Sequence, residues 1–192
     1  MQTTVAILAG GLSRRMGQDK AVLVLNGRTL LERAARTAHD VAPSVLVVGR
    51  DRPPGWPIPD TRFVPDDLTD VGPLGGLATA LRSAGGDDVL AVACDMPRLT
   101  PSALRWLFEQ AVTRSPESHG VAVLNEGRVE PLFSVYAAAC LPLIESQLAA
   151  GRRSLHALIT AGRFEQAEAP PDICAALVNV NTPEEWAGIV ER

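Results

Sequence analysis

The chain has 192 residues, 46% of them hydrophobic, which is enough to bury the core of one domain. Eighteen basic and 22 acidic residues give a net charge of −4, and no basic run follows the N-terminal region, so the composition excludes a nucleic-acid-binding surface. The sequence has no apolar stretch long enough to span a membrane, no signal peptide and no closely spaced cysteines, so we expect one cytoplasmic domain over residues 1–192 with small partners and no membrane contact.

Strand patterns and helix patterns alternate along the chain. Nearly continuous apolar strands in β-α-β order are typical of a mostly parallel sheet with helices on both faces. The pair Glu126-Gly127 between two strand patterns predicts a late antiparallel hairpin. We therefore predict a single-domain, Rossmann-like α/β fold. The predicted strands cover about residues 3–9, 44–49, 62–64, 88–93, 120–124, 130–136 and 177–180.

Capping signals mark three of the predicted helices. Thr29 stands three residues before Glu32, a spacing typical of a capping box. A threonine followed by a proline, as at residues 100–101 and 182–183, supplies an N-cap and a first helical residue. The predicted helices cover about residues 29–39 and 100–113 and begin again near residues 77 and 182.

A glycine-rich, basic loop follows the first predicted strand. Gly10 and Gly11 allow backbone N–H groups to approach a phosphate closely, because no Cβ intervenes. Arg15 and Lys20 add charge-assisted donors. The spacing fits neither of the two commonest phosphate loops, and a plain turn with solvated basic side chains is the alternative. The whole set directly after a strand favours a site for a nucleoside triphosphate.

Asp95 directly follows Cys94 at the end of the predicted strand 88–93. Ligands of such a sheet bind outside the carboxyl ends of the strands. Magnesium in phosphoryl-transfer sites takes only one or two carboxylates together with substrate phosphates. Asp95 is therefore the candidate Mg²⁺ ligand, and the alternative is that it caps the turn before Thr100.

Two further segments reach the same edge of the predicted sheet. Asp66 follows a short strand, and a carboxylate suits the neighbouring N–H donors of guanine, with an ordinary Asx turn as the alternative. Gly75 belongs to a glycine-rich turn before a predicted helix. This turn would place backbone N–H groups near a nucleotide, and the alternative is a plain tight turn.

Near the C-terminus, Asn179 and Asn181 alternate onto one side of the last predicted strand. Their amides offer uncharged hydrogen-bond donors and acceptors to the substrate that receives the transferred group. The alternative is that Asn181 forms hydrogen bonds with the exposed end of the last strand. The three histidines, at positions 39, 119 and 156, lie outside every motif and are expected at the surface or in the core.

These motifs resemble those of the MobA-type molybdopterin guanylyltransferases. Residues 8–20 follow the family's L-A-G-G-x-S-x-R-M-G-x-D-K signature, and Glu130 stands where some members carry histidine. The resemblance implies an α/β fold of the nucleotide-diphospho-sugar transferase type. The family's C-D-x-P, G-P-L-x-G, P-L-F-x-x-Y and N-V-N-T-P-E-E motifs occur here at residues 94–97, 72–76, 131–136 and 179–185.

The resemblance implies that GMP is transferred from GTP to the terminal phosphate of molybdenum-bound molybdopterin, with release of pyrophosphate. An acceptor phosphate is already anionic near neutral pH, so no general base is required. The resemblance assigns catalytic roles to Arg15, Lys20 and Asp95. It implies that Asp95 binds Mg²⁺ and that Asn179 and Asn181 bind the acceptor. Nucleotide binding is assigned to Leu8, Ala9, Gly10, Gly11, Lys20, Asp66, Gly75 and Asp95.

The resemblance also implies transient contact with apo-molybdoenzymes or other molybdenum cofactor proteins. The nearest alternative is the same chemistry with CTP and molybdopterin, or with a nucleotide and a sugar phosphate. An alternative of another class is a carrier that binds nucleotide or cofactor without turnover. The presence of both Lys20 and Asp95 favours an enzyme over such a carrier.

Overall fold

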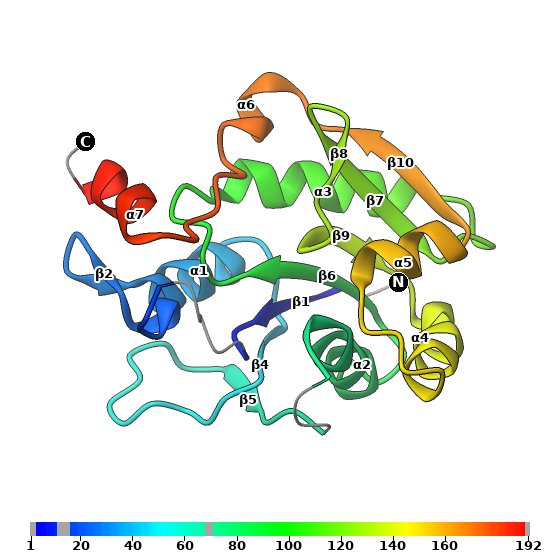
Figure 1. Cartoon of the computed structure of the whole chain (residues 1–192), viewed down its shortest axis with the longest axis horizontal. Coiled ribbons are helices and arrows are strands. Elements are labelled where there is room, and N and C mark those ends of the chain that lie inside the picture. Colours follow the sequence, from blue (N-terminus) through cyan, green and yellow to red (C-terminus); the bar gives the residue numbers. More distant parts are fainter. Residues whose placement is uncertain (1–2, 11–15, 68–70, 191–192) are drawn as a thin grey trace.

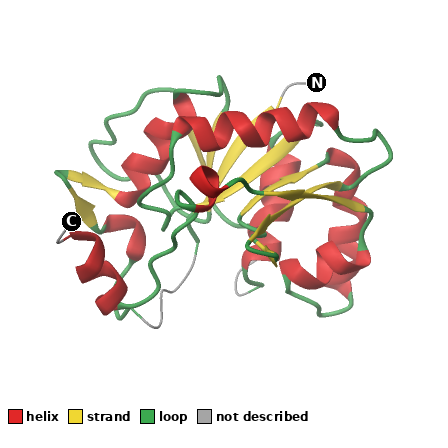
Figure 2. Cartoon of the chain, turned by 90° about the horizontal axis from the view of Figure 1, so that it is seen from above, coloured by secondary structure: helices red, strands yellow, loops and turns green. Residues whose placement is uncertain are grey.

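The structure, a computed structural model, describes residues 3–10, 16–67 and 71–190. They form one mixed sheet with helices on both faces and a separate two-stranded hairpin (Figures 1 and 2). The hairpin consists of β2 (Val24–Leu25) and β3 (Arg28–Thr29). The main sheet contains β1 (Thr3–Leu8), β4 (Val45–Val48), β5 (Thr61–Val64), β6 (Asp88–Ala93), β7 (Gly120–Asn125), β8 (Arg128–Val129), β9 (Phe133–Tyr136) and β10 (Phe164–Glu168).

The order of the main sheet is β10-β7-β9-β6-β1-β4-β5, with β8 paired to β7. The four neighbouring strands β6, β1, β4 and β5 are parallel, and β10 is parallel to β7. Strand β9 runs antiparallel to both β6 and β7, and β8 turns back on β7 through the positive-φ pair Glu126-Gly127. The predicted mostly parallel α/β sheet with a late antiparallel hairpin is therefore confirmed.

Helices cover the two faces of the sheet. Helices α1 and α3 pack on one face, while α2, α4 and α5 pack on the other. None of the helices in the described ranges is long and apolar enough to cross a membrane. The helices are α1 (Leu30–His39), α2 (Pro73–Ser83), α3 (Pro101–Thr113), α4 (Leu141–Ala149), α5 (Leu155–Ala161), α6 (Pro171–Cys174) and α7 (Pro183–Val190), with 3-10 turns at Lys20–Val22 and Ala138–Cys140.

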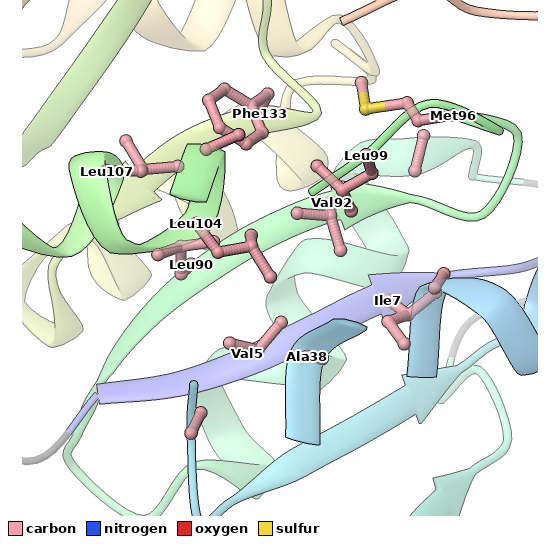
Figure 3. Close-up of a cluster of buried hydrophobic side chains, with 14 of the residues drawn as sticks. Val5, Ile7, Ala38, Leu90, Val92, Met96, Leu99, Leu104, Leu107 and Phe133 are labelled. Carbon is pink, nitrogen blue, oxygen red and sulfur yellow. The ribbon is translucent and has the colours of Figure 1, made fainter. Parts of the chain in front are cut away.

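The sequences of the central strands are almost continuously apolar because helices cover both faces of the sheet. Val5 and Ile7 of β1 point toward α1 and α3, whereas Ala6 points toward α2. Figure 3 shows the first of these layers, in which Val5, Ile7 and Leu90 lie beneath Leu104. All four of these side chains are fully buried, so the sheet forms a rigid base for the loops at its carboxyl edge.

The predicted helix caps are present. Thr29 Oγ1 accepts from the N–H of Glu32 at 3.1 Å, and Glu32 Oε2 accepts from the N–H of Thr29 at 2.8 Å, which completes the capping box of α1. Thr100 Oγ1 accepts from the N–H of Ala103 at 3.2 Å at the start of α3. Helix α2 starts at Pro73, four residues before the predicted start, because Pro73 is itself a favourable first helical residue.

The predicted strand over residues 177–180 is wrong. These residues form no strand ladder, and a backbone hydrogen bond from Val180 N to Asp95 O at 3.0 Å holds them beside the segment that follows β6. Leu177 is buried in the core on one face of the sheet, and Val180 packs with Leu30 of α1 and Trp186 of α7. The edge strand instead is β10, whose sequence Phe164–Glu168 is largely polar and shows no apolar strand pattern.

Candidate active site

A cavity of about 240 Å³ opens at the carboxyl ends of β1, β4 and β6. This is the edge at which open α/β sheets bind ligands. The strand ends face the side of the molecule that carries β2 and α7 (Figure 1). Of the residues predicted to bind nucleotide, the cavity brings together Leu8, Ala9, Gly10, Lys20, Asp66 and Asp95.

Gly75 is a predicted nucleotide-binding residue that does not line this cavity. Gly11 and Arg15 lie outside the described residues. Gly75 lies within the first turns of α2, where its N–H donates to Gly72 O at 3.0 Å. Its neighbours Gly72 and Gly76 line the cavity instead, so this end of α2 still forms one wall.

Two glycines allow the backbones after β1 and β4 to touch. A Cβ on Gly10 would lie 2.9 Å from Gly49 Cα and 2.7 Å from Asp66 Oδ2. Gly49 has φ +91, and a Cβ there would lie 2.5 Å from Gly10 Cα. Neither position accepts a side chain without movement of the backbone. Sequence reasoning missed the role of Gly49, for which the only signal is a glycine directly after an apolar strand.

Asp66 points into the cavity, whereas its neighbour Asp67 turns away. Asp67 pairs with Arg82 of α2 at 3.2 Å on the outer surface. Asp66 Oδ1 is buried and accepts no hydrogen bond from the described residues. Burial raises the pKa of Asp66, and the charge of Asp67 raises it further. A buried acceptor without a partner is unfavourable in the free protein and is suited to a ligand that brings N–H donors.

Lys20 joins the cavity to the C-terminal segment. Asp19 caps the 3-10 turn that carries Lys20, its Oδ1 accepting from Ala21 N at 3.0 Å. The ammonium of Lys20 donates to Asp95 Oδ2 at 2.7 Å and to Asn181 Oδ1 at 2.8 Å. The side chains of Lys20 and Asp95 are only 13% and 17% exposed, so this ion pair is poorly screened by water. Sequence positions far apart thus meet at one charged centre.

Arg50 contacts two residues that line the cavity, and sequence reasoning missed it. Its guanidinium donates from Nη2 to Asp19 Oδ2 at 2.5 Å and from Nε to Ala9 O at 3.4 Å. These contacts link the end of β4 to the loop that carries Lys20. The available signal was an arginine directly after the glycine that ends a predicted strand. Arg50 therefore positions the Lys20 loop against the β1 end.

The carboxylates of the cavity fit a divalent metal ion that also binds the phosphates of a substrate. Among the described residues, no group of three or more His, Cys, Asp or Glu side chains is arranged to hold a metal. Asp19, Asp66 and Asp95 are the acidic side chains that line the cavity, and Asp95 contacts Lys20. Magnesium commonly keeps several waters and takes one or two protein carboxylates, so this small donor set is sufficient when substrate oxygens complete the shell.

A second hollow of about 310 Å³ adjoins this cavity, which is called the first hollow below. The two share Pro73, Ala93, Asp95 and Leu132 as lining residues. The predicted acceptor residues Asn179 and Asn181 both line the second hollow, although their segment is no strand. Asn179 Oδ1 is buried and has no hydrogen-bond partner among the described residues. Two compartments therefore meet at Asp95.

The second hollow also contains Glu130 and His156, and the sequence motifs did not include His156.

Cys94 lies beside Asp95. Burial raises the pKa of its thiol to about 12, and the nearby charge of Asp95 contributes to this shift. A thiol of this kind is protonated near neutral pH and is a poor nucleophile. The chemistry available at this site is therefore binding, alignment and charge neutralisation rather than covalent catalysis by cysteine.

The chain is similar to known proteins in sequence. Residues 5–168 match the family model of the MobA-like NTP transferase domain. A protein of Pelotomaculum thermopropionicum named "Probable molybdenum cofactor guanylyltransferase" is 37% identical over 96% of this chain and 90% of its own length.

Solved structures share the fold. The molybdopterin-guanine dinucleotide biosynthesis protein A from Archaeoglobus fulgidus superposes with a TM-score of 0.81 at 22% identity, over 98% of this chain and 97% of that chain. The 2-C-methyl-D-erythritol 4-phosphate cytidylyltransferase from Thermus thermophilus superposes with a TM-score of 0.70 at 21% identity, over 100% of this chain and 98% of that chain. Both likenesses concern the fold alone.

Proposed function

This chain belongs to the MobA-like NTP transferase domain family, and we propose that it transfers GMP from GTP to the terminal phosphate of molybdopterin, forming molybdopterin guanine dinucleotide and pyrophosphate. One observation carries the proposal beyond the family. The Lys20–Asp95 pair stands at the boundary between a glycine-lined hollow and a second hollow lined by two asparagines. This arrangement suits two anionic substrates that react where they meet.

The nucleotide occupies the first hollow. The backbone of residues 8–10 approaches the phosphates, and Lys20 supplies a positive charge beside them. Gly11, Arg15 and Gly75 remain predictions for the same phosphate-binding region. Asp66 accepts from the neighbouring N–H donors of guanine, which explains a buried carboxylate oxygen without a partner. Cytosine lacks this pair of adjacent donors, so the same carboxylate disfavours CTP.

The acceptor occupies the second hollow, with its phosphate next to Lys20. An oxygen of this phosphate attacks the α-phosphorus, the bond from that phosphorus to the bridging oxygen of the β-phosphate breaks, and pyrophosphate leaves with the electron pair. Asp95 would hold Mg²⁺, which supplies charge neutralisation at the crowded phosphates when bound. Lys20 and Asn181 align the two substrates, and no residue needs to remove a proton from the anionic acceptor.

Turnover with each of the four nucleotides tests the proposal. We expect pyrophosphate release with GTP only when molybdopterin is present, and at least about tenfold less release with ATP, CTP or UTP. Asp66→Asn should reduce this preference, whereas Asp67→Asn, which alters the adjacent carboxylate outside the cavity, should retain it. Equal turnover with CTP would support a cytidylyltransferase, a sugar phosphate acting as acceptor would support the related chemistry, and nucleotide binding without any release would support a carrier protein.

A further inference from the structure

The hollow proposed for the acceptor contains a carboxylate whose role the reaction does not explain. Glu130 lines it together with Asn179 and His156. Glu130 is about half buried, and it forms no ion pair within the described ranges of the chain. Its side chain accepts a hydrogen bond from Asn125, whose Nδ2 lies 3.4 Å from Oε1. Glu130 therefore retains acceptor capacity toward the hollow, since a carboxylate can accept several hydrogen bonds.

The backbone holds Glu130 firmly in this position. Its N–H donates to Val123 O at 2.8 Å, and its carbonyl accepts from Phe133 N at 3.0 Å and from Ser134 Oγ at 2.8 Å. Ser134 is fully buried between the strands. The loop between β8 and β9 is thus anchored to β7 and β9, and a carboxylate on so rigid a base is preorganised for a ligand.

A further acceptor, which unlike Glu130 has no partner among the described residues, lines the same hollow. Asn179 Oδ1 is buried without a hydrogen bond among the described residues. Burial raises the pKa of Glu130, while the Asn125 amide and then His156 oppose that shift. Two partly desolvated acceptors in one hollow favour a ligand that presents several N–H donors, because such donors satisfy both of them.

We propose that Glu130 is a specificity-determining residue that recognises the aminopyrimidinone ring of the pterin acceptor by accepting from its amino group and adjacent ring N–H. This assignment rests on the proposed function, which makes a pterin the acceptor. The two N–H groups of that ring are neighbours and match the two oxygens of one carboxylate. Asn179 offers its oxygen to a further N–H of the pterin. The phosphate end of the same molecule then lies toward Lys20 and Asp95.

Steady-state kinetics on Glu130→Gln tests this assignment. Glutamine keeps the size but replaces one acceptor oxygen by an amide NH₂, which opposes the N–H donors of the pterin. We expect KM for molybdopterin to rise at least about tenfold while KM for GTP changes less than about twofold. Glu130→Asp, which retains the charge on a side chain one methylene shorter, should give a smaller increase. Glu126→Gln is the matched control, since Glu126 is exposed in the neighbouring turn and outside this hollow.

The outcomes separate the two proposals. If wild-type protein makes the dinucleotide and KM for molybdopterin is unchanged in Glu130→Gln, the role of Glu130 is wrong and the proposed function stands. If wild-type protein makes no dinucleotide from GTP and molybdopterin, the proposed function itself fails. If KM for GTP rises in parallel in Glu130→Gln and Glu130→Asp, Glu130 supports the fold of the site rather than the pterin, and the assignment is overturned.

Discussion

Lys20 is the only lysine in the chain, whereas 17 arginines supply the other basic side chains. Its Nζ lies 2.7 Å from Asp95 and 2.8 Å from Asn181. Its compact ammonium contacts two oxygens from different elements, and a larger planar guanidinium would present its donors in a different geometry. The single lysine therefore stands at the position where its geometry matters most.

Replacing Lys20 tests this point at the residue scale. We expect Lys20→Ala to reduce kcat by about 100-fold, because a charge at the reacting phosphates is lost. Lys20→Arg should restore little of this loss, since its charge is kept but its shape is wrong. Initial rates at saturating GTP and acceptor provide the measurement. Full activity in Lys20→Arg would show that charge alone is sufficient.

Asp66 should link stability to pH. Its pKa in the folded protein is raised by burial and by Asp67, so folding favours the protonated form. Its contribution to stability is thus complete below the ordinary carboxyl pKa of about 4 and is lost as pH rises through the raised pKa. At pH 7 the ionised group is a cost, and Asp66→Asn should raise Tm by a few degrees, about 2–4 °C per kcal/mol. The gain should vanish near pH 4; a gain that is the same at both pH values would contradict this explanation.

At the scale of elements, the contact between the ends of β1 and β4 depends on Gly10 and Gly49. We expect Gly10→Ala to weaken GTP binding at least about tenfold. The added Cβ would lie 2.7 Å from Asp66 Oδ2 and would displace this carboxylate. It would also lie 2.9 Å from Gly49 Cα and would push the two strand ends apart. Gly188→Ala in α7 is the control, since no atom of the described residues lies within 4 Å of its added Cβ apart from its chain neighbours and the backbone of its own helix. Calorimetric titration of GTP compares the two; equal affinity in both variants would refute the close approach.

The capping box of α1 gives a separate test of stability. Thr29→Ala removes the acceptor for Glu32 N and should destabilise the protein by about 1 kcal/mol. Thr37→Ala, which lies in the same helix but away from its cap, should have a smaller effect because alanine has the higher helix propensity. Chemical denaturation measures both changes. A loss in Thr37→Ala as large as that in Thr29→Ala would mean that the cap contributes little.

The elements that sequence patterns predict well are those whose patterns come from burial on both faces, such as β1 and β6. Strand β10 escapes prediction because it is held by pairing with β7, while its own residues 164–168 are mostly polar. Residues 177–180 give the opposite error: they are predicted as a strand but form none. Their apolar residues Leu177 and Val180 are buried in side-chain packing without strand pairing. Local motifs select Asp66, Lys20 and Asp95 as candidates, and all three line one cavity. The contact of Lys20 with Asn181, 161 positions away, depends on the complete fold.

At the scale of the whole molecule, the N-terminal loop and the C-terminal segment meet through Lys20 and Asn181. Phosphates that attract Lys20 should weaken its bond to Asn181 and leave that amide available to the acceptor. We therefore expect a non-hydrolysable GTP analogue to increase the affinity for molybdopterin about fivefold or more, with the reciprocal effect on the analogue. Asn181→Ala should abolish this coupling. Equal acceptor affinity with and without the analogue would show that the two hollows bind independently.

Transfer of label from α-³²P-GTP to molybdopterin, compared between wild-type protein and Asp95→Asn, tests the central claim most directly. We expect labelled dinucleotide from the wild type, and at least about 100-fold less from Asp95→Asn with the fold intact, because the substitution removes the carboxylate at the boundary of the two hollows but little volume. Asp51→Asn, on an exposed loop, should transfer label normally. Normal label transfer by Asp95→Asn would contradict the account, since the reaction would then proceed without the group that joins both substrates.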